Sequence, residues 1–223
     1  IQTGIVKYYG DDAAKYDKEN KLKIKRIYDL VPSNIENKVK RIQFKSIEDK
    51  RGVRFCTYEN EFDYLLSSGI VLGSKAISEP KFPLIQSANK NLIRLYMNDV
   101  GLFTNILYKN NIQAVFEDKE KVNLGAVYET VIAAELQSHG HNLFYYDRKK
   151  IGEVDFLIDD YDSLSPLPLE IKSGKDFHNY KALPKLLEEE NYHIKKGYVL
   201  SNSREVKKEN NIIFLPIYYS MFL

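Results

Sequence analysis

Two apolar segments of the chain carry ionisable side chains at positions where a β-strand would bury them. The stretch GEVDFLIDDYDSLSPLPLEIKSGK, residues 152–175, contains Asp155 in the run VDFLI and both Glu170 and Lys172 in the run LPLEIKS. A charged group inside an apolar strand costs free energy unless it is paired or binds a ligand. The two runs therefore predict a pair of buried strands that carries a polar site.

Alternation along these strands predicts which side chains share a face. Successive side chains of a β-strand point to opposite faces, so Asp155 and Leu157 are expected on one face, opposite Val154. The same period places Glu170 and Lys172 together. The loop DDYDSLSP between the two runs suits a hairpin. If the strands are adjacent, the carboxylates of Asp155 and Glu170 converge.

Two converging carboxylates resist joint ionisation unless a cation lies between them. Mg²⁺ or Mn²⁺ would accept Asp155 and Glu170 as oxygen ligands, with the carbonyl of Ile171 as the natural additional ligand. Lys172 could then position the attacking water or stabilise charge on a phosphate. The alternative is a structural ion pair on a half-exposed sheet, in which the Lys and the two acids neutralise one another.

The order of apolar patterns predicts two parts. Residues 1–85 are expected to form a mainly helical, winged-helix-like module, with a helix that ends at Pro32 and a helix-then-strand unit over 57–77. The proline-containing segment 79–91 is expected as a junction. Residues 90–223 give the order α-β-β-β-α-β-β, which indicates a mixed α/β sheet.

Composition limits the class of partner and the compartment. The net charge is +2, but residues 38–54 hold seven basic and two acidic residues, a local +5 (seven minus two). This segment and the turn Arg148–Lys150 are either solvated or contact a phosphate backbone, which makes DNA a possible partner. A single cysteine fits a reducing cytoplasm, and no apolar run is long enough to span a membrane.

The pattern of Asp155, Glu170 and Lys172 resembles the catalytic signature of the PD-(D/E)XK nuclease superfamily. Glu129, in GAVYETVIAAEL, also matches, because many members carry an acid on the helix before the core strands; an ordinary position on the helix surface is the alternative. The resemblance covers residues 92–217. It implies an α/β fold with a restriction-endonuclease-like mixed sheet flanked by helices.

A second resemblance covers nearly the whole chain. IRLYMNDVGLF, LGAVYETVIAAEL, GEVDFLI and LEIKSGK are similar to the C-terminal region of a prokaryotic family of AAA-type ATPases. In that family a nucleotide-binding module precedes a winged-helix part and this nuclease-like part. No P-loop motif occurs in the 223 residues, so no ATPase activity is expected from them alone. The resemblance implies either a Mg²⁺-dependent DNA phosphodiesterase or a non-catalytic region that binds nucleic acid or protein.

Overall fold

A computed structural model describes residues 2–13, 15, 20–37, 40–48, 54–109, 113, 124–174 and 180–223. The helices are α1 (Gln2–Ala13), α2 (Lys21–Glu36), α3 (Glu59–Ser67), α4 (Val100–Tyr108), α6 (Leu124–Ser138) and α7 (Ala182–Leu187). The strands are β1 (Val71–Ile77), β2 (Ala88–Met97), β3 (Leu143–Arg148), β4 (Gly152–Asp160), β5 (Ser165–Lys172), β6 (Gly197–Ser201), β7 (Lys207–Glu209) and β8 (Ile212–Pro216). Part of the predicted basic segment, residues 38–39 and 49–53, lies outside the described residues.

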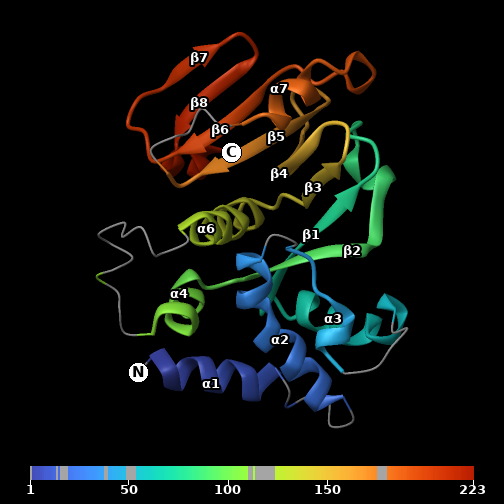
Figure 1. The fold of residues 1–223 in the computed structure, drawn as a ribbon, viewed down its shortest axis with the longest axis vertical. Coiled ribbons are helices and arrows are strands. Elements are labelled where there is room, and N and C mark those ends of the chain that lie inside the picture. Colours follow the sequence, from blue (N-terminus) through green and yellow to red (C-terminus); the bar gives the residue numbers. More distant parts are fainter. Residues whose placement is uncertain are drawn as a thin grey trace. The chain divides into compact units, whose positions relative to one another are not determined.

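The strands form one eight-stranded sheet in the order β2-β1-β3-β4-β5-β6-β8-β7 (Figure 1). Pairs β1–β3, β5–β6 and β6–β8 are parallel, whereas β3–β4, β4–β5 and β7–β8 are antiparallel. The expected α/β class, with a mixed sheet flanked by helices and a mainly helical N-terminal part, is confirmed. The helix-then-strand unit expected over 57–77 is present as α3 and β1.

The chain divides into two compact units that interleave in sequence. One contains residues 1–73 and 93–134, and the other contains residues 74–92 and 135–223. The segment 79–91, expected as a junction, forms a 3₁₀ turn at Leu84–Ser87 and the start of β2. Leu84 is fully buried and belongs to a core cluster of the second unit. The two domains predicted from the sequence, 1–85 and 90–223, stay a prediction.

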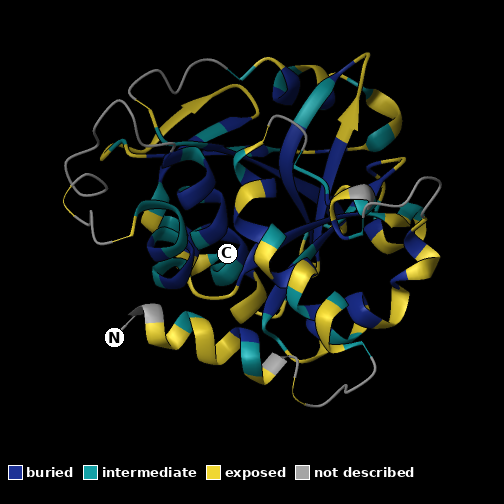
Figure 2. Cartoon of the chain, turned by 60° about the horizontal axis from the view of Figure 1, so that its bottom comes forward, coloured by how far each residue is buried: buried dark blue, intermediate teal, exposed yellow. Residues whose placement is uncertain are grey.

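The first unit is built around the buried face of α2. Ile24, Ile27, Val31 and Ile35 recur at helical spacing and are at most 2% exposed. Helix α2 continues through Pro32 to Glu36, so the helix end predicted at Pro32 is wrong. A proline inside a helix costs about 3 kcal/mol, and burial of Val31 and Ile35 on either side of it offsets that cost. By contrast, most of the α1 residues whose burial is described are exposed (Figure 2).

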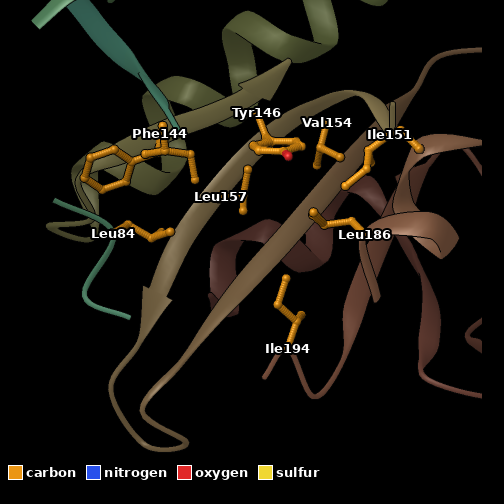
Figure 3. Packing of buried hydrophobic residues seen from close by; sticks show 10 residues of the cluster. Leu84, Phe144, Tyr146, Ile151, Val154, Leu157, Leu186 and Ile194 are labelled. Atoms are coloured by element: carbon orange, nitrogen blue, oxygen red, sulfur yellow. The ribbon is translucent and has the colours of Figure 1, made fainter. Parts of the chain in front are cut away.

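The second unit buries one face of β3 and β4 against α7 (Figure 3). Val154 and Leu157 of β4 lie in the same cluster as Leu186 of α7. Strict alternation would place Val154 and Leu157 on opposite faces, so that prediction is wrong. The β3–β4 register shifts between Phe144 and Tyr146, and such a bulge inserts one extra residue into a strand. Because β4 has one more residue than β3 over this stretch, Val154 and Leu157 both point into the same core.

Candidate active site on strands β4 and β5

Asp155 lies in the interior of β4 and is only 7% exposed. Its Oδ2 accepts a hydrogen bond of 2.9 Å from the backbone N–H of Ile171 on β5. The β4–β5 pairing joins Phe156 to Leu169, and extending that register by one residue brings Asp155 opposite Glu170. The aspartate carboxylate therefore lies against the backbone of the Glu170–Lys172 segment, although 16 positions separate Asp155 from Ile171 in the chain.

Glu170 and Lys172 form an ion pair on β5. The Lys172 Nζ lies 2.8 Å from the Glu170 Oε1. The glutamate side chain is 8% exposed and the lysine side chain 24% exposed, so the carboxylate is deeply buried while the ammonium retains partial access to water. Charge-assisted hydrogen bonds of this length compensate part of the cost of burying a carboxylate. The pair is consistent with both interpretations of the segment, a metal site and a structural ion pair.

Ile171 supplies backbone groups at the same position. Residues of an antiparallel strand exchange N–H and C=O bonds on one edge, so both groups of one residue point the same way. The N–H of Ile171 points to Asp155. Its carbonyl therefore points to the same edge of β5, towards β4.

These donors fit a small hard cation better than zinc. In the part of the chain that the structure describes, no group of three or more His, Cys, Asp or Glu side chains could hold a metal ion. Mg²⁺ is commonly bound through only one or two carboxylates, with water and phosphate oxygens completing the shell. Asp155, Glu170 and the Ile171 carbonyl would provide such a partial set of ligands. The predicted Mg²⁺ or Mn²⁺ site thus requires a phosphate or water for the remaining positions.

Glu129, the fourth predicted site residue, lies on α6 in the first unit. It is 6% exposed, and the Nζ of Lys40 lies 2.6 Å from its Oε1. Lys40 belongs to the basic segment for which phosphate contact was one interpretation. Sequence reasoning did not find this pair, because the two residues are 89 positions apart and no local pattern connects them.

A buried serine beside Lys172 was also not recognised from the sequence. The parallel β5–β6 register pairs Lys172 with Ser201, which has no exposed surface. Paired residues of neighbouring parallel strands share a face, so the Ser201 hydroxyl lies on the Lys172 face. Its Oγ accepts a hydrogen bond of 3.2 Å from the N–H of Ser203. Ser201 lies in the run YVLSNS at the end of a strand, and nothing in that local sequence distinguishes it from an ordinary serine at a strand end.

The turn before β4 carries exposed positive charge. Arg148, Lys149 and Lys150 are all exposed. Lys150 forms an ion pair of 2.6 Å with Glu189, and a hydrogen bond with that carboxylate raises the pKa of the lysine. The cations lie at the β3–β4 turn, at the start of the strand that carries Asp155. Such a cluster can contact a phosphate backbone.

Two models of protein families match parts of the chain. Residues 1–113 match a family model described as a domain of unknown function (DUF8612), which covers 113 of the 223 residues. The chain belongs to the DUF8612 family. In this DUF8612 member, residues 124–219 also match a model described as a domain of unknown function (DUF4143). Asp155, Glu170 and Lys172 lie within the DUF4143 match, as does Glu129, whereas Lys40 lies within the DUF8612 match.

Comparisons with curated proteins and with solved structures gave no match. None of the helices in the described segments is both long and apolar enough to cross a membrane.

Proposed function

We propose that Asp155, Glu170 and Lys172 form a divalent-metal-dependent site that hydrolyses phosphodiester bonds in DNA. The observation that supports this most is the hydrogen bond from the Ile171 N–H to the Asp155 carboxylate. It holds one acid of the proposed site against the backbone between the other acid and the lysine. In a purely structural ion pair, the cross-strand aspartate would have no need to contact that backbone position.

Each residue has a distinct part in the proposed reaction. Asp155 and Glu170, with the Ile171 carbonyl, would hold Mg²⁺ or Mn²⁺, which when bound lowers the pKa of a water ligand and polarises the phosphodiester. Lys172 is partly accessible to water, and its ammonium would donate to a non-bridging phosphate oxygen or to the attacking water. Binding of a cation would replace Lys172 as the partner of Glu170 and release the ammonium for substrate. Glu129 lies in the first unit and the other three residues lie in the second, so no part in this reaction is proposed for Glu129.

The proposed context is the C-terminal part of an AAA-type ATPase in the cytoplasm. The support is the similarity of LGAVYETVIAAEL, GEVDFLI and LEIKSGK to that family, together with the single cysteine. A nucleotide-binding module in cis would supply ATP hydrolysis. Exposed Arg148 and Lys149 would contact the DNA backbone near the start of β4.

Calorimetric titration with MnCl₂ and MgCl₂, in the presence and absence of a short DNA duplex, tests the metal site. We expect saturable binding by the wild type and its loss in Asp155→Asn, because the amide keeps the acceptor for the Ile171 N–H but removes the charge. Asp63→Asn, which changes an exposed acid on α3, is the matched control and should bind as the wild type does. The wild type and the control variant should also cleave supercoiled plasmid, and Asp155→Asn should not. Wild-type protein that binds neither metal, even with DNA, would overturn the proposal.

The second candidate is a non-catalytic region that binds nucleic acid or protein. It is favoured by the ion pairs that already neutralise two of the predicted acids, Lys172 with Glu170 and Lys40 with Glu129. Gel-shift titration of a labelled duplex distinguishes the two functions. Retained DNA binding with no cleavage by the wild type, and no effect of Asp155→Asn on either, would favour the binding region.

A further inference from the structure

Strands β5 and β6 end side by side, and each ends with a polar residue. Lys172 is the last residue of β5 and Ser201 is the last residue of β6, and the two parallel strands pair these residues with each other. The segment that joins the strands contains α7, so this part of the unit is a β-α-β crossover. In open α/β sheets, ligands bind outside the carboxyl ends of the strands. Lys172 belongs to the proposed nuclease site at this edge, and Ser201 is its neighbour there.

The packing of β6 shows which face of the sheet the two side chains share. Val199 lies in a core cluster with Leu183 of α7, and Ser201 follows Val199 two positions later, on the same face. The β5–β6 register pairs Val199 with Glu170 and Ser201 with Lys172. Paired residues of neighbouring parallel strands point to the same face. The serine hydroxyl and the ion pair of β5 therefore lie together on the face that α7 covers.

The Ser201 hydroxyl is buried and held in place. The residue has no exposed surface, and its Oγ accepts a hydrogen bond of 3.2 Å from the N–H of Ser203. The hydroxyl of Ser203 in turn accepts the N–H of Glu205 at 3.2 Å, so two successive hydrogen bonds order the turn after β6. A hydroxyl oxygen has two lone pairs. Within the part of the chain that the structure describes, the Ser203 N–H is the one donor to the Ser201 Oγ, which leaves one lone pair for a further donor.

The side chain of Lys172 is long enough to reach this hydroxyl. Its Nζ lies 2.8 Å from the Glu170 Oε1, although two residues of a strand span about 6.6 Å. Neighbouring strands lie only about 4.8 Å apart, so Ser201 is closer to the lysine backbone than Glu170 is. The lysine side chain is 24% exposed and can change rotamer. The ammonium can therefore move from the carboxylate to the hydroxyl without movement of either strand.

Metal binding at the proposed site would require such a movement. A cation bound by Glu170 would take the place of the ammonium and repel it. The displaced ammonium of Lys172 is mostly buried, so it needs another acceptor to compensate the loss of its hydration. An ammonium has three N–H donors. One N–H donated to Ser201 would leave two for a phosphate oxygen or for the attacking water.

We propose that Ser201 is a positioning residue that holds Lys172 when a cation occupies the site. Without a cation, the ammonium pairs with Glu170, the contact that the structure contains. With a cation on Glu170, the ammonium donates to the Ser201 Oγ and stays beside the bound phosphate. This inference rests on the proposed metal-dependent function. It adds a second, defined position for the lysine.

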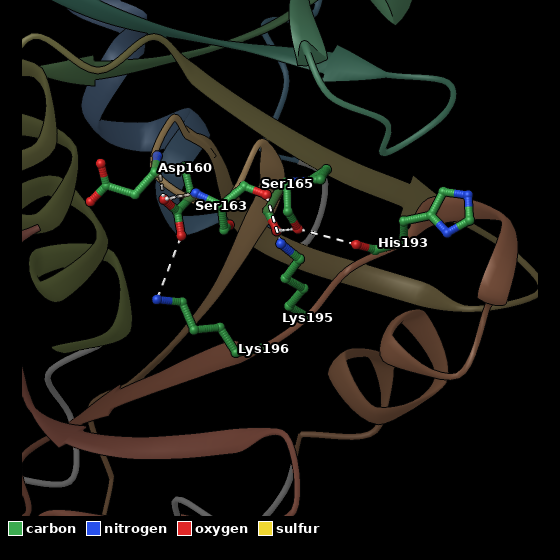
Figure 4. Close-up of polar contacts among 8 residues, drawn as sticks. Asp160, Ser163, Ser165, His193, Lys195 and Lys196 are labelled. Atoms are coloured by element: carbon green, nitrogen blue, oxygen red, sulfur yellow. Dashed lines mark hydrogen bonds and ion pairs between the residues drawn. The ribbon is translucent and has the colours of Figure 1, made fainter.

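Ser165 provides a matched control at the opposite end of β5. It is 3% exposed, and its hydroxyl donates to the carbonyl of His193 at 3.2 Å (Figure 4). Ser165 is the first residue of the strand that Lys172 ends, so this hydroxyl is remote from the ammonium. Ser165→Ala should lower the stability of the protein, because it removes a buried hydrogen bond, without changing the affinity for metal.

The test is calorimetric titration of the full chain with MnCl₂ in the presence of a short DNA duplex. We expect Ser201→Ala to weaken Mn²⁺ binding about tenfold, because the ammonium loses its second acceptor and competes with the cation for Glu170. Ser201→Thr, which keeps a hydroxyl, should bind Mn²⁺ within about twofold of the wild type. Ser165→Ala should bind as the wild type does. Circular dichroism checks that each variant is folded.

A double-variant cycle with Lys172 distinguishes positioning from a structural role. Lys172→Met should still bind Mn²⁺, because no ammonium competes for Glu170, and the addition of Ser201→Ala should then change nothing. Equal weakening by Ser201→Ala in both backgrounds, or wild-type affinity of the single variant, would overturn the role of Ser201 and leave the proposed function intact. A wild type that binds no Mn²⁺, even with DNA, would overturn both.

Discussion

The ammonium of Lys172 lies 2.8 Å from the carboxylate of Glu170, its neighbour two positions earlier on the same face of β5. The carboxylate is the more deeply buried partner, so it depends on this contact more than the lysine does. The contact would exist before metal binding in a nuclease site, and it would be permanent in a structural ion pair. Variants that remove one partner at a time separate its contribution to stability from any contribution to catalysis.

Lys172→Met should lower the free energy of unfolding by about 1–3 kcal/mol, because it leaves a buried carboxylate without its cation. Urea denaturation followed by circular dichroism measures this change. The double variant Lys172→Met/Glu170→Gln should recover most of the loss, since it removes the uncompensated charge. If Lys172→Met is as stable as the wild type, the ion pair does not compensate the burial of Glu170.

The pair of Lys40 and Glu129 should contribute more to stability, because both side chains are largely buried, 18% and 7% exposed. Lys40→Met should cost about 2–4 kcal/mol. Lys25→Met is the control: Lys25 contacts Asp11 at 3.3 Å, but both side chains are over 40% exposed, so a change within about 0.5 kcal/mol is expected. If the two substitutions lower the free energy of unfolding equally in urea denaturation, the buried pair of Lys40 and Glu129 contributes no more to stability than an exposed pair.

Local sequence patterns predicted several elements in the second half of the chain correctly. The helix at 124–138 and strands β3, β4 and β5 each carry several apolar residues at the spacing of their own structure, so no distant contact is needed to recognise them. Strand β7 was missed, because KKE has three exposed residues and no apolar alternation. Its position depends on pairing with β8, which a local pattern does not report.

The parts of the site that were not predictable depend on long-range geometry. The bulge near Asp155 is a property of the β3–β4 register, so counting alternate residues in EVDFLID assigned Val154 and Leu157 to different faces. The contact of Lys40 with Glu129 joins residues far apart in the chain. By contrast, Glu170 and Lys172 are two positions apart, and the period of a strand was sufficient to place them together.

Asp159 and Asp160 are adjacent at the end of β4, and their contributions to stability should depend on pH in opposite directions. Burial raises the pKa of Asp159, so its contribution to stability is present below the ordinary aspartate pKa of about 4 and is lost as pH rises. Asp159→Asn should therefore be more stable than the wild type at neutral pH, and the difference should shrink towards acid pH. The amide oxygen can still accept the Leu84 N–H.

Asp160 provides the matched comparison. Burial acts to raise its pKa, but hydrogen bonds from Ser163 and Asp162 and the charge of Lys196 outweigh it and lower the pKa. Its stabilising contribution is present above the ordinary aspartate pKa and is lost as pH falls through the lowered value. Asp160→Asn should thus destabilise at neutral pH. Thermal unfolding from neutral to acid pH measures both variants, and the same sign for both would contradict these assignments.

Substitution of Gly197 and of Gly4 by alanine should change the stability of the protein in opposite directions. A Cβ at Gly197 would lie 2.8 Å from the Leu183 Cδ1 and 3.3 Å from the Pro168 Cγ, in the core between β6 and α7. Gly197→Ala should cost about 1–3 kcal/mol, because the packed leucine must move. A Cβ at Gly4, on the exposed helix α1, would meet no atom within 4 Å. Gly4→Ala should therefore stabilise the chain by up to about 1 kcal/mol through helix propensity.

Thermal and urea unfolding of the two single variants and their combination complete this test. The two sites lie in different units, so their effects should add if unfolding is cooperative. An unchanged stability of Gly197→Ala would mean that Leu183 adopts another rotamer without loss of packing. A destabilised Gly4→Ala would show that α1 contacts something at that position, because added helix propensity alone can only stabilise an exposed helix.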